Sequence, residues 1–119
     1  MQTVVLDTNA LLMPFEIKLN LDLELKGLLG DFRCVVPGPL IGELKHLDHK
    51  YAKAALQLAR KYDIIQTTHS GDEAVIEAAI ATGGYILTND KKLRLAARNQ
   101  KIPLIFLRSS THLILETID

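Results

Sequence analysis

The feature that most constrains the fold is a regular alternation of short β-rich apolar runs with longer segments of helical periodicity. Five short runs are rich in β-branched and large apolar residues, and we expect strands at residues 3–6, 32–36, 64–67, 85–88 and 103–107. Apolar residues recur every three or four positions between them, and we expect helices within residues 21–29, 40–47, 52–59, 74–81 and 90–99. The pattern predicts an α/β fold, a three-layer α/β/α sandwich with a mainly parallel central sheet of roughly five strands.

Residues that break regular structure lie between these segments, where loops are needed. Gly30 follows the first expected helix, Pro37 to Pro39 precede the second, and Pro103 restarts an extended segment. No linker or low-complexity stretch divides the chain, and 119 residues suit one compact core. We therefore expect a single domain over residues 1–119. The tail from Ser109 to Asp119 is compatible with either a final strand or a short packed arm.

The composition is that of an ordinary water-soluble protein. Apolar residues make up 48% of the chain and charged residues 24%, and no apolar run approaches the roughly 20 residues that cross a membrane. The first residues carry no basic region, so we expect no secretory signal, no membrane partner and a cytoplasmic location. The single cysteine, Cys34, lacks a disulfide partner, and its apolar neighbours indicate a buried core thiol.

The net charge is zero, so a nucleic acid would have to be held by a local patch and not by the field of the whole chain. One segment has basic residues and no acid, and it contains Lys91, Lys92, Arg94, Arg98, Lys101 and Arg108. This segment is a candidate nucleic-acid contact, although a solvated helix face explains the same charges equally well.

Four acidic residues lie where an open parallel sheet binds its ligands, outside the carboxyl ends of the strands. Asp7 directly follows the first expected strand, and Asp90 lies just beyond the fourth. Asp72 begins the helix before the fourth strand, and Glu43 lies in the first turns of the helix after the second. Each alone could cap a helix or lie on an exposed helix face. Four at one edge would repel one another unless a cation or bound protons compensated, so the pattern indicates a metal site.

The available ligands indicate which metal this site would take. Carboxylate oxygens without cysteine or a histidine cluster select hard cations, so we expect Mg²⁺ or Mn²⁺ in preference to Zn²⁺. A zinc site at His46 and His49 is the alternative, because the two side chains could share a helix face. No third soft ligand accompanies them in the sequence, and a solvated helix end or an RNA contact explains the pair.

Over nearly its whole length the chain resembles the PIN-domain family. Four stretches carry the resemblance, each with one acid: residues 4–9 with Asp7, 35–44 with Glu43, 71–79 with Asp72, and 88–93 with Asp90. The resemblance implies a Mg²⁺- or Mn²⁺-dependent nuclease that usually acts on RNA, with these acids as metal ligands and catalytic residues. The third acid could instead be Glu73, but the spacing of Asp72 from Gly83 and Thr88 matches the family's run from acid to glycine to threonine.

The resemblance also implies roles for the neighbours of the acids. Thr8, Asn9, Thr88 and Asn89 would orient the carboxylates and bound waters, although each could simply cap the helix that follows. The cations that would contact the RNA phosphates are Lys91, Lys92 and Arg94.

Protein partners are a further implication of the resemblance. The family often dimerises, and the apolar segments Met13 to Phe15 and Leu113 to Leu115 are the expected patches. An antitoxin or an RNA-processing complex is another expected class of partner. The stretches at residues 13–25 and 37–39 favour the stand-alone archaeal or ribosomal RNA processing branch over VapC-type toxins.

Three other classes of protein compete with this interpretation. A phosphotransferase of the haloacid dehalogenase type needs a second aspartate where this chain has Asn9, and a receiver domain needs neighbouring acids that are missing. The serious alternative is a non-catalytic RNA- or protein-binding PIN domain that acts within an RNA-processing complex. The intact set of four acids favours the enzyme.

Overall fold

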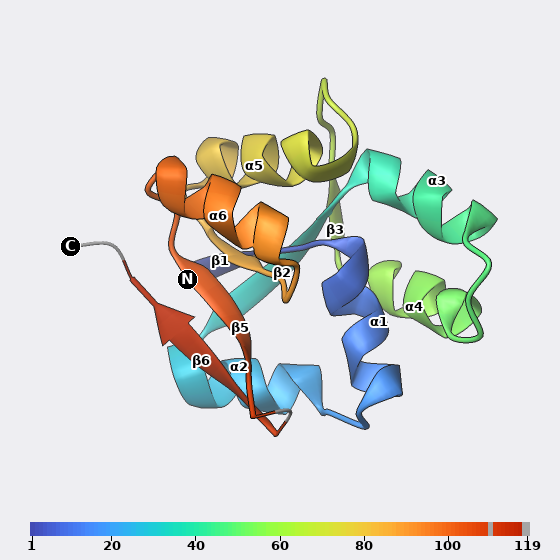
Figure 1. Cartoon of the computed structure of the whole chain (residues 1–119), viewed down its shortest axis with the longest axis horizontal. Coiled ribbons are helices and arrows are strands. Elements are labelled where there is room, and N and C mark those ends of the chain that lie inside the picture. Colours follow the sequence, from blue (N-terminus) through green and yellow to red (C-terminus); the bar gives the residue numbers. More distant parts are fainter. Residues whose placement is uncertain (110, 118–119) are drawn as a thin grey trace.

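The structure is a computed structural model that describes residues 1–109 and 111–117, in which helices connect the first five strands in succession and a sixth strand follows directly (Figure 1). The strands are β1 (Gln2–Leu6), β2 (Phe32–Pro37), β3 (Asp63–Ile65), β4 (Tyr85–Leu87), β5 (Leu104–Arg108) and β6 (His112–Glu116). The helices are α1 (Thr8–Glu16), α2 (Leu21–Leu29), α3 (Gly38–His46), α4 (Ala52–Ala59), α5 (Gly71–Thr82) and α6 (Lys91–Asn99). The expected α/β class is confirmed.

All the strands belong to one sheet, in the order β3-β2-β1-β4-β5-β6. The pairs from β3 to β5 are parallel, and β6 runs antiparallel to β5. The chain builds outward from β1 to β2 and β3, then returns to add β4 and β5 on the other side of β1. The order therefore reverses between β1 and β4, and ligands of open parallel sheets bind at such a point, beyond the carboxyl ends of the strands.

Helices cover both faces of the sheet, as the predicted three-layer sandwich requires. Figure 1 shows α5 and α6 above the sheet and α2 below it, while α1, α3 and α4 lie together on the side toward which β1 runs. Helix α5 packs on β1, β2 and β4, and α2 packs on β2 and β6. These helices leave the carboxyl edge of β1 and β4 accessible between the first turns of α1, α3, α5 and α6.

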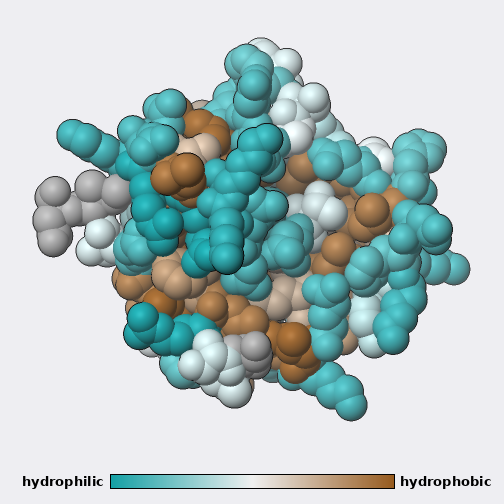
Figure 2. Space-filling view, viewed as in Figure 1, coloured by the Kyte–Doolittle hydropathy of each residue, from teal (hydrophilic) through white to brown (hydrophobic). Residues whose placement is uncertain are grey.

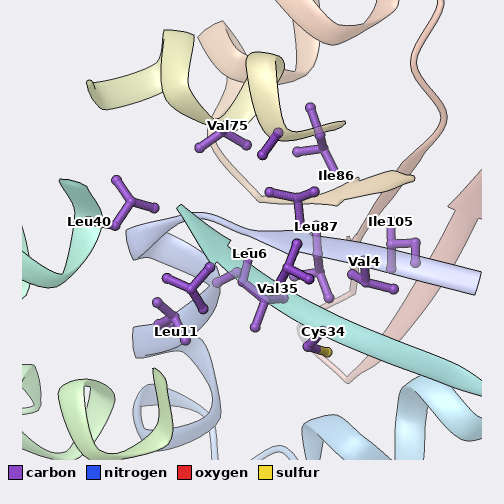
Figure 3. Packing of buried hydrophobic residues seen from close by; sticks show 14 of the residues in the cluster. Val4, Leu6, Leu11, Cys34, Val35, Leu40, Val75, Ile86, Leu87 and Ile105 are labelled. Atoms are coloured by element: carbon purple, nitrogen blue, oxygen red, sulfur yellow. The ribbon is translucent and has the colours of Figure 1, made fainter. Parts of the chain in front are cut away.

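The central strands are apolar because both of their faces are covered. Val4, Val5 and Leu6 of β1 have no exposed surface, and Ile86 and Leu87 of β4 have none either. Figure 3 shows such side chains projecting from both faces of the sheet into the helical layers. Burying each of these side chains stabilises the fold by about 1.5–3 kcal/mol before the loss of conformational entropy. The two strands that present the switch point are therefore held firmly.

For the tail, the strand is the alternative that the structure shows: β6 pairs with β5, and the sheet has six strands within the described residues. One element differs from the sequence-based expectations. A helix follows β1 directly, where none was predicted. The Asp7 carboxylate caps this helix by accepting a hydrogen bond from the Ala10 amide, 2.7 Å away. Pro14 lies inside α1 and lacks an amide hydrogen, so it weakens the helical signal in the sequence without preventing the helix.

The segments expected to form a dimer patch are instead packed within the chain. Met13 is 2% exposed and Leu113 is 3% exposed, and their apolar neighbours Phe15 and Leu115 pack against the same core. Only the half-buried residues of these segments could still contact a partner, so the dimer patch stays a prediction. Cys34 is buried as expected, and burial raises the pKa of its thiol to about 12. In the described part of the chain, every helix is too short or too polar to cross a membrane.

Candidate functional site

A cavity of about 190 Å³ opens at the carboxyl edge of the sheet, beside the ends of β1 and β4. Figure 1 shows the first turns of α1, α5 and α6 approaching one another there, with α3 beside them. The cavity, which we call the acid cavity, is lined by Asp7, Thr8, Asn9, Leu40, Glu43, Gly71, Asp72, Val75 and Asp90. All four acids selected from the sequence thus line one cavity, and each lies in or at the start of a different helix.

Asp7 is the most constrained of the four. It is 7% exposed, and one carboxylate oxygen accepts from the Ala10 amide while the other accepts from the Thr88 hydroxyl at 2.5 Å. Burial raises the pKa of Asp7 to about 6, and the charges of Asp72 and Asp90 act in the same direction, against the two hydrogen bonds. The carboxylate is fixed in orientation, yet its negative charge is poorly compensated by the protein.

Thr88 links the two acids that follow neighbouring strands. Its side chain is completely buried, and its hydroxyl donates to Asp7 while accepting from the Asp90 amide at 3.1 Å. Asp90 in turn caps α6, because its carboxylate accepts from the Leu93 amide at 2.9 Å. Thr88 therefore orients the Asp7 carboxylate, and the cap of α6 is Asp90.

Glu43 and Asp72 complete the wall from two helices. Burial raises the pKa of Glu43, the charge of Asp72 raises it further, and the Gly71 amide opposes both. Asp72 lies in the first turn of α5, at the cavity. Glu73 is absent from the cavity wall, and its carboxylate lies 3.9 Å from His69 Nε2 with 79% of the side chain exposed. Asp72 therefore lines the cavity and Glu73 does not, and the role of Asp72 as the third acid stays a prediction.

Sequence reasoning missed a residue that holds the loop in front of Asp72. The Glu77 carboxylate, one turn further along α5, accepts from the Thr68 amide and hydroxyl and from the His69 amide, all within 3.0 Å. His69 Nδ1 also donates to it at 2.8 Å. These hydrogen bonds lower the pKa of Glu77 to about 2, that from His69 most strongly, and the pKa of His69 is raised. Thr68 and His69 precede Glu77 by nine and eight residues, which is neither a capping nor a helical spacing. No local sequence signal therefore marks this contact.

The two asparagines take different positions. Asn9 lies on the cavity wall, and its side-chain oxygen accepts from the Asn89 amide at 3.1 Å. The Asn89 side chain points elsewhere, accepting from the Leu107 amide at 2.8 Å and donating to the Met13 sulfur at 3.2 Å. Asn89 therefore ties the end of β4 to β5 and α1, and its support for the acid cavity is indirect.

The donor chemistry of the cavity fits a hard divalent cation. Its polar wall consists of carboxylates, a hydroxyl and an amide, and Thr8 Oγ1 is buried there without a hydrogen-bond partner in the described residues. Within those residues, no three histidine, cysteine, aspartate or glutamate side chains lie close enough together to hold a metal ion by themselves. Magnesium retains several waters and needs few protein ligands, so an open set of carboxylates suits it. Mg²⁺ or Mn²⁺ therefore fits this wall better than Zn²⁺ does.

The alternative zinc pair has other contacts. His49 Nε2 donates to Glu16 at 3.2 Å, and His49 Nδ1 accepts from the Tyr51 amide at 3.0 Å. Both ring nitrogens of His49 are thus engaged, while His46 is the last residue of α3. The described residues give this pair no third metal ligand.

The basic residues of α6 are not equivalent. Figure 2 shows hydrophilic side chains gathered over this helix, and Lys91 and Lys92 are exposed in its first turn beside Asp90. Arg94 is half-buried, with its guanidinium carbon 4.7 Å from the centre of the Phe106 ring. Arg98 pairs with Glu116 through two hydrogen bonds of 2.7 and 3.0 Å. The two lysines are therefore better placed than Arg94 to contact a ligand at the acid cavity.

A comparison with protein families identifies the family of this chain. Residues 4–110 match the family described as a PIN like domain. The chain belongs to the PIN-like domain family. The domain is 29% identical to "Ribonuclease VapC9" of Archaeoglobus fulgidus, over 97% of this chain and 90% of that protein. It is 32% identical to "Ribonuclease VapC4" of Methanocaldococcus jannaschii, over 94% of this chain and 95% of that protein.

Solved structures show the same fold for this PIN-like domain. The "Structure of the PIN domain endonuclease Utp24" has a TM-score of 0.78 and 21% identity, over 98% of this chain and 96% of that one. A domain of a functionally unknown protein from Methanocaldococcus jannaschii has a TM-score of 0.66 and 17% identity over the whole of both chains. The PIN-domain resemblance is confirmed. The preference for a ribosomal RNA processing branch stays a prediction, because both curated relatives carry VapC names.

Proposed function

We propose that this PIN-like domain is a divalent-metal-dependent ribonuclease that hydrolyses RNA phosphodiester bonds at the acid cavity. The observation that carries the proposal is the gathering of Asp7, Glu43, Asp72 and Asp90 around one small cavity at the switch point of the sheet. The chain has no net charge, so this concentration of acids is local and calls for a local cation. The ribonuclease names of the two relatives that span nearly the whole chain support RNA as the substrate.

The four acids would hold Mg²⁺ or Mn²⁺. A bound cation of this kind lowers the pKa of water and offsets negative charge on the scissile phosphate. Thr88 keeps the Asp7 carboxylate in one orientation by donating to it, which limits the rearrangement needed on binding. The unpartnered Thr8 hydroxyl and the Asn9 side chain would orient a water or a phosphate oxygen at the cavity wall.

Lys91 and Lys92 would attract the RNA phosphates next to the cavity, in a manner that weakens with added salt. Arg94 would contribute less, because its guanidinium already stacks on Phe106. A protein partner, whether a second copy, an antitoxin or an RNA-processing complex, also stays a prediction. The segments first expected to bind a second copy each have one buried residue, Met13 and Leu113, which reduces the apolar area that they offer to a partner.

A cleavage assay on single-stranded RNA with Mn²⁺, Mg²⁺ or EDTA tests the proposal. We expect metal-dependent cleavage by the wild type and its loss in Asp90→Asn, which keeps a side chain that can cap α6. The matched control is Asp48→Asn, because Asp48 is exposed and is not on the cavity wall. RNA binding without cleavage by the wild type would contradict the proposal and favour the non-catalytic alternative.

A further inference from the structure

A second hollow lies on the other side of α3 from the acid cavity. This hollow, which we call the α3 groove, has a volume of about 530 Å³ and lies between α3, the end of α4 and the segment that follows β3. Its polar lining comes from Lys45 of α3, Arg60 at the end of α4, and Gln66 and Thr67 after β3. It contains two cations, an amide and a hydroxyl, and no carboxylate among the described residues.

The charge of the α3 groove is not neutralised by its surroundings. Lys45 and Arg60 are exposed, and neither forms an ion pair within the described part of the chain. Residues 45–61 hold one acid, Asp48, against Lys45, Lys50, Lys53, Arg60 and Lys61. A neutral chain thus carries a basic region that the sequence analysis did not single out. A groove with this lining is complementary to an anion with hydrogen-bonding groups.

The groove and the acid cavity share their walls. Leu40 and Glu43 of α3 line the cavity, whereas Ile41 and Lys45 line the groove, so the two hollows lie on opposite faces of one helix. The segment that begins with Gln66 and Thr67 at the groove continues to Gly71 and Asp72 at the cavity. An α-helix with its side chains is about 10–12 Å across. An anion that occupies both hollows must therefore be a chain of several linked charges that bends over α3.

We propose that the α3 groove binds the phosphate backbone of single-stranded RNA, a few nucleotides from the bond that lies in the acid cavity. The inference rests on the proposed function, because the acid cavity is what places the strand beside α3. Lys45 and Arg60 pair with successive phosphates, and Gln66 and Thr67 hydrogen-bond to the sugar or phosphate oxygens. A flexible single strand can follow the curved path, whereas a stiff duplex cannot. The groove makes substrate affinity depend on RNA length.

The test compares two variants that each remove two positive charges. Lys45→Gln/Arg60→Gln empties the groove of cations, and Lys53→Gln/Lys61→Gln is the control, since these two lysines do not line the groove. Binding of fluorescent single-stranded RNA is measured in an Asp90→Asn background, with probes of about three and about twelve nucleotides. For the longer probe, we expect the groove variant to bind about tenfold more weakly near 0.1 M salt, with a salt slope smaller by about 1.4 than that of the wild type.

The shorter probe should bind equally well to all the proteins, and with the native acids the groove variant should raise KM for the longer RNA by a larger factor than it changes kcat. Equal affinities of the groove and control variants for the longer probe overturn the inference, as does an equal loss for both probe lengths. Tighter binding of an acidic peptide than of RNA at Lys45 and Arg60 also overturns it. If the wild type neither binds nor cleaves RNA, the proposed function fails together with this inference. If the wild type cleaves RNA in a metal-dependent manner but the groove variant binds the longer probe as tightly as the wild type does, only this inference fails.

Discussion

Asp7 combines two roles that oppose each other in the absence of metal. Its carboxylate caps α1 and accepts from Thr88, which stabilises the fold. Its charge, however, is buried near Asp72 and Asp90, which raises its pKa to about 6. The folded chain therefore binds a proton at Asp7 more tightly than the unfolded chain does. Stability from this group is fully present below the ordinary pKa of 3.8 and is lost as the pH rises to about 6.

We predict that Asp7→Asn stabilises the metal-free protein at neutral pH. The amide keeps an oxygen for the Ala10 amide and removes the buried charge but loses the acceptor for Thr88, so the gain is at most about 3 kcal/mol above pH 6 and vanishes below pH 4. Urea unfolding in EDTA between pH 4 and pH 8 measures it, with Asp48→Asn as the exposed control. Added Mn²⁺ should stabilise the wild type more than Asp7→Asn. Parallel pH curves for the two proteins would show that burial of this charge is not destabilising.

Gly84 marks a place where two backbones approach closely. A Cβ atom at this position would lie 2.6 Å from the Thr3 carbonyl oxygen of β1. We predict that Gly84→Ala lowers the unfolding free energy by about 1–3 kcal/mol, because neither backbone can move without disturbing the central strands. Gly27→Ala is the control: it lies inside α2 with open space around it, and it should stabilise by about 0.5–1 kcal/mol. Thermal unfolding that moves in the same direction for both variants would contradict this account.

At the scale of elements, the acid cavity depends on the loop between β3 and α5. This loop carries no regular hydrogen bonding of its own, and Glu77 holds it through donors from Thr68 and His69. The anchored loop ends at Gly71, where the first turn of α5 presents Asp72 to the cavity. Glu77 is thus a positioning residue, which acts on the site through the loop and does not touch the cavity.

We predict that Glu77→Gln frees this loop and weakens cleavage without unfolding the chain. Glutamine offers one acceptor oxygen where the carboxylate offers two, and its amide faces donors that it cannot satisfy. Hydrogen exchange at residues 68 and 69 should rise, the pKa of His69 should fall in an NMR titration, and kcat/KM at limiting Mn²⁺ should drop several-fold. The control is Asp48→Asn, because Asp48 is exposed and lies outside this loop. An unchanged pKa of His69 would exclude the proposed anchor.

The strands and most helices were predictable because their signals are local. Runs such as Val4 to Leu6 are apolar on both faces, and the rule for ligands of parallel sheets selected Asp7 and Asp90. Helix α1 was missed because Pro14 interrupts its pattern, and a capping role for Asp7 was only one of two interpretations of this residue. The end of β3 was misplaced, since Gln66 and Thr67 leave the sheet to line the α3 groove. The Glu77 anchor joins residues with no helical or strand spacing, so only the structure reveals it.

The whole molecule separates its charges although their sum is zero. Acids gather at the cavity, and cations without an ion pair among the described residues lie on either side of it, in the α3 groove and in the first turn of α6. The pairing of Arg98 with Glu116 removes one basic residue of α6 from this distribution. An RNA strand that crosses the cavity would therefore meet positive charge on both sides. The electrostatic attraction for RNA is therefore confined to a path over the cavity. A chain without net charge has no long-range field that attracts a polyanion.

The surface most suited to self-association lies between α5 and α6, in a hollow of about 790 Å³. Its floor is apolar and includes Ile76, Ile80 and Ala96, and Ile80 is 62% exposed. Acidic residues of α5, such as Glu73, lie on one rim, and Lys92 of α6 lies on the other. A two-fold axis would set the acidic rim of each copy against the basic rim of the other, which makes the surface self-complementary.

We predict that two copies associate through this hollow. Ile80→Glu places a charge on the apolar floor and should give a monomer at concentrations where the wild type sediments mainly as a dimer. Leu23→Glu is the matched control, because Leu23 is 65% exposed on α2 and does not line the hollow. Higher salt should also weaken the dimer, since the two rims attract each other through exposed charges. If sedimentation velocity shows only monomer for the wild type, the dimer is excluded. If Ile80→Glu and Leu23→Glu dissociate equally, the contact lies elsewhere.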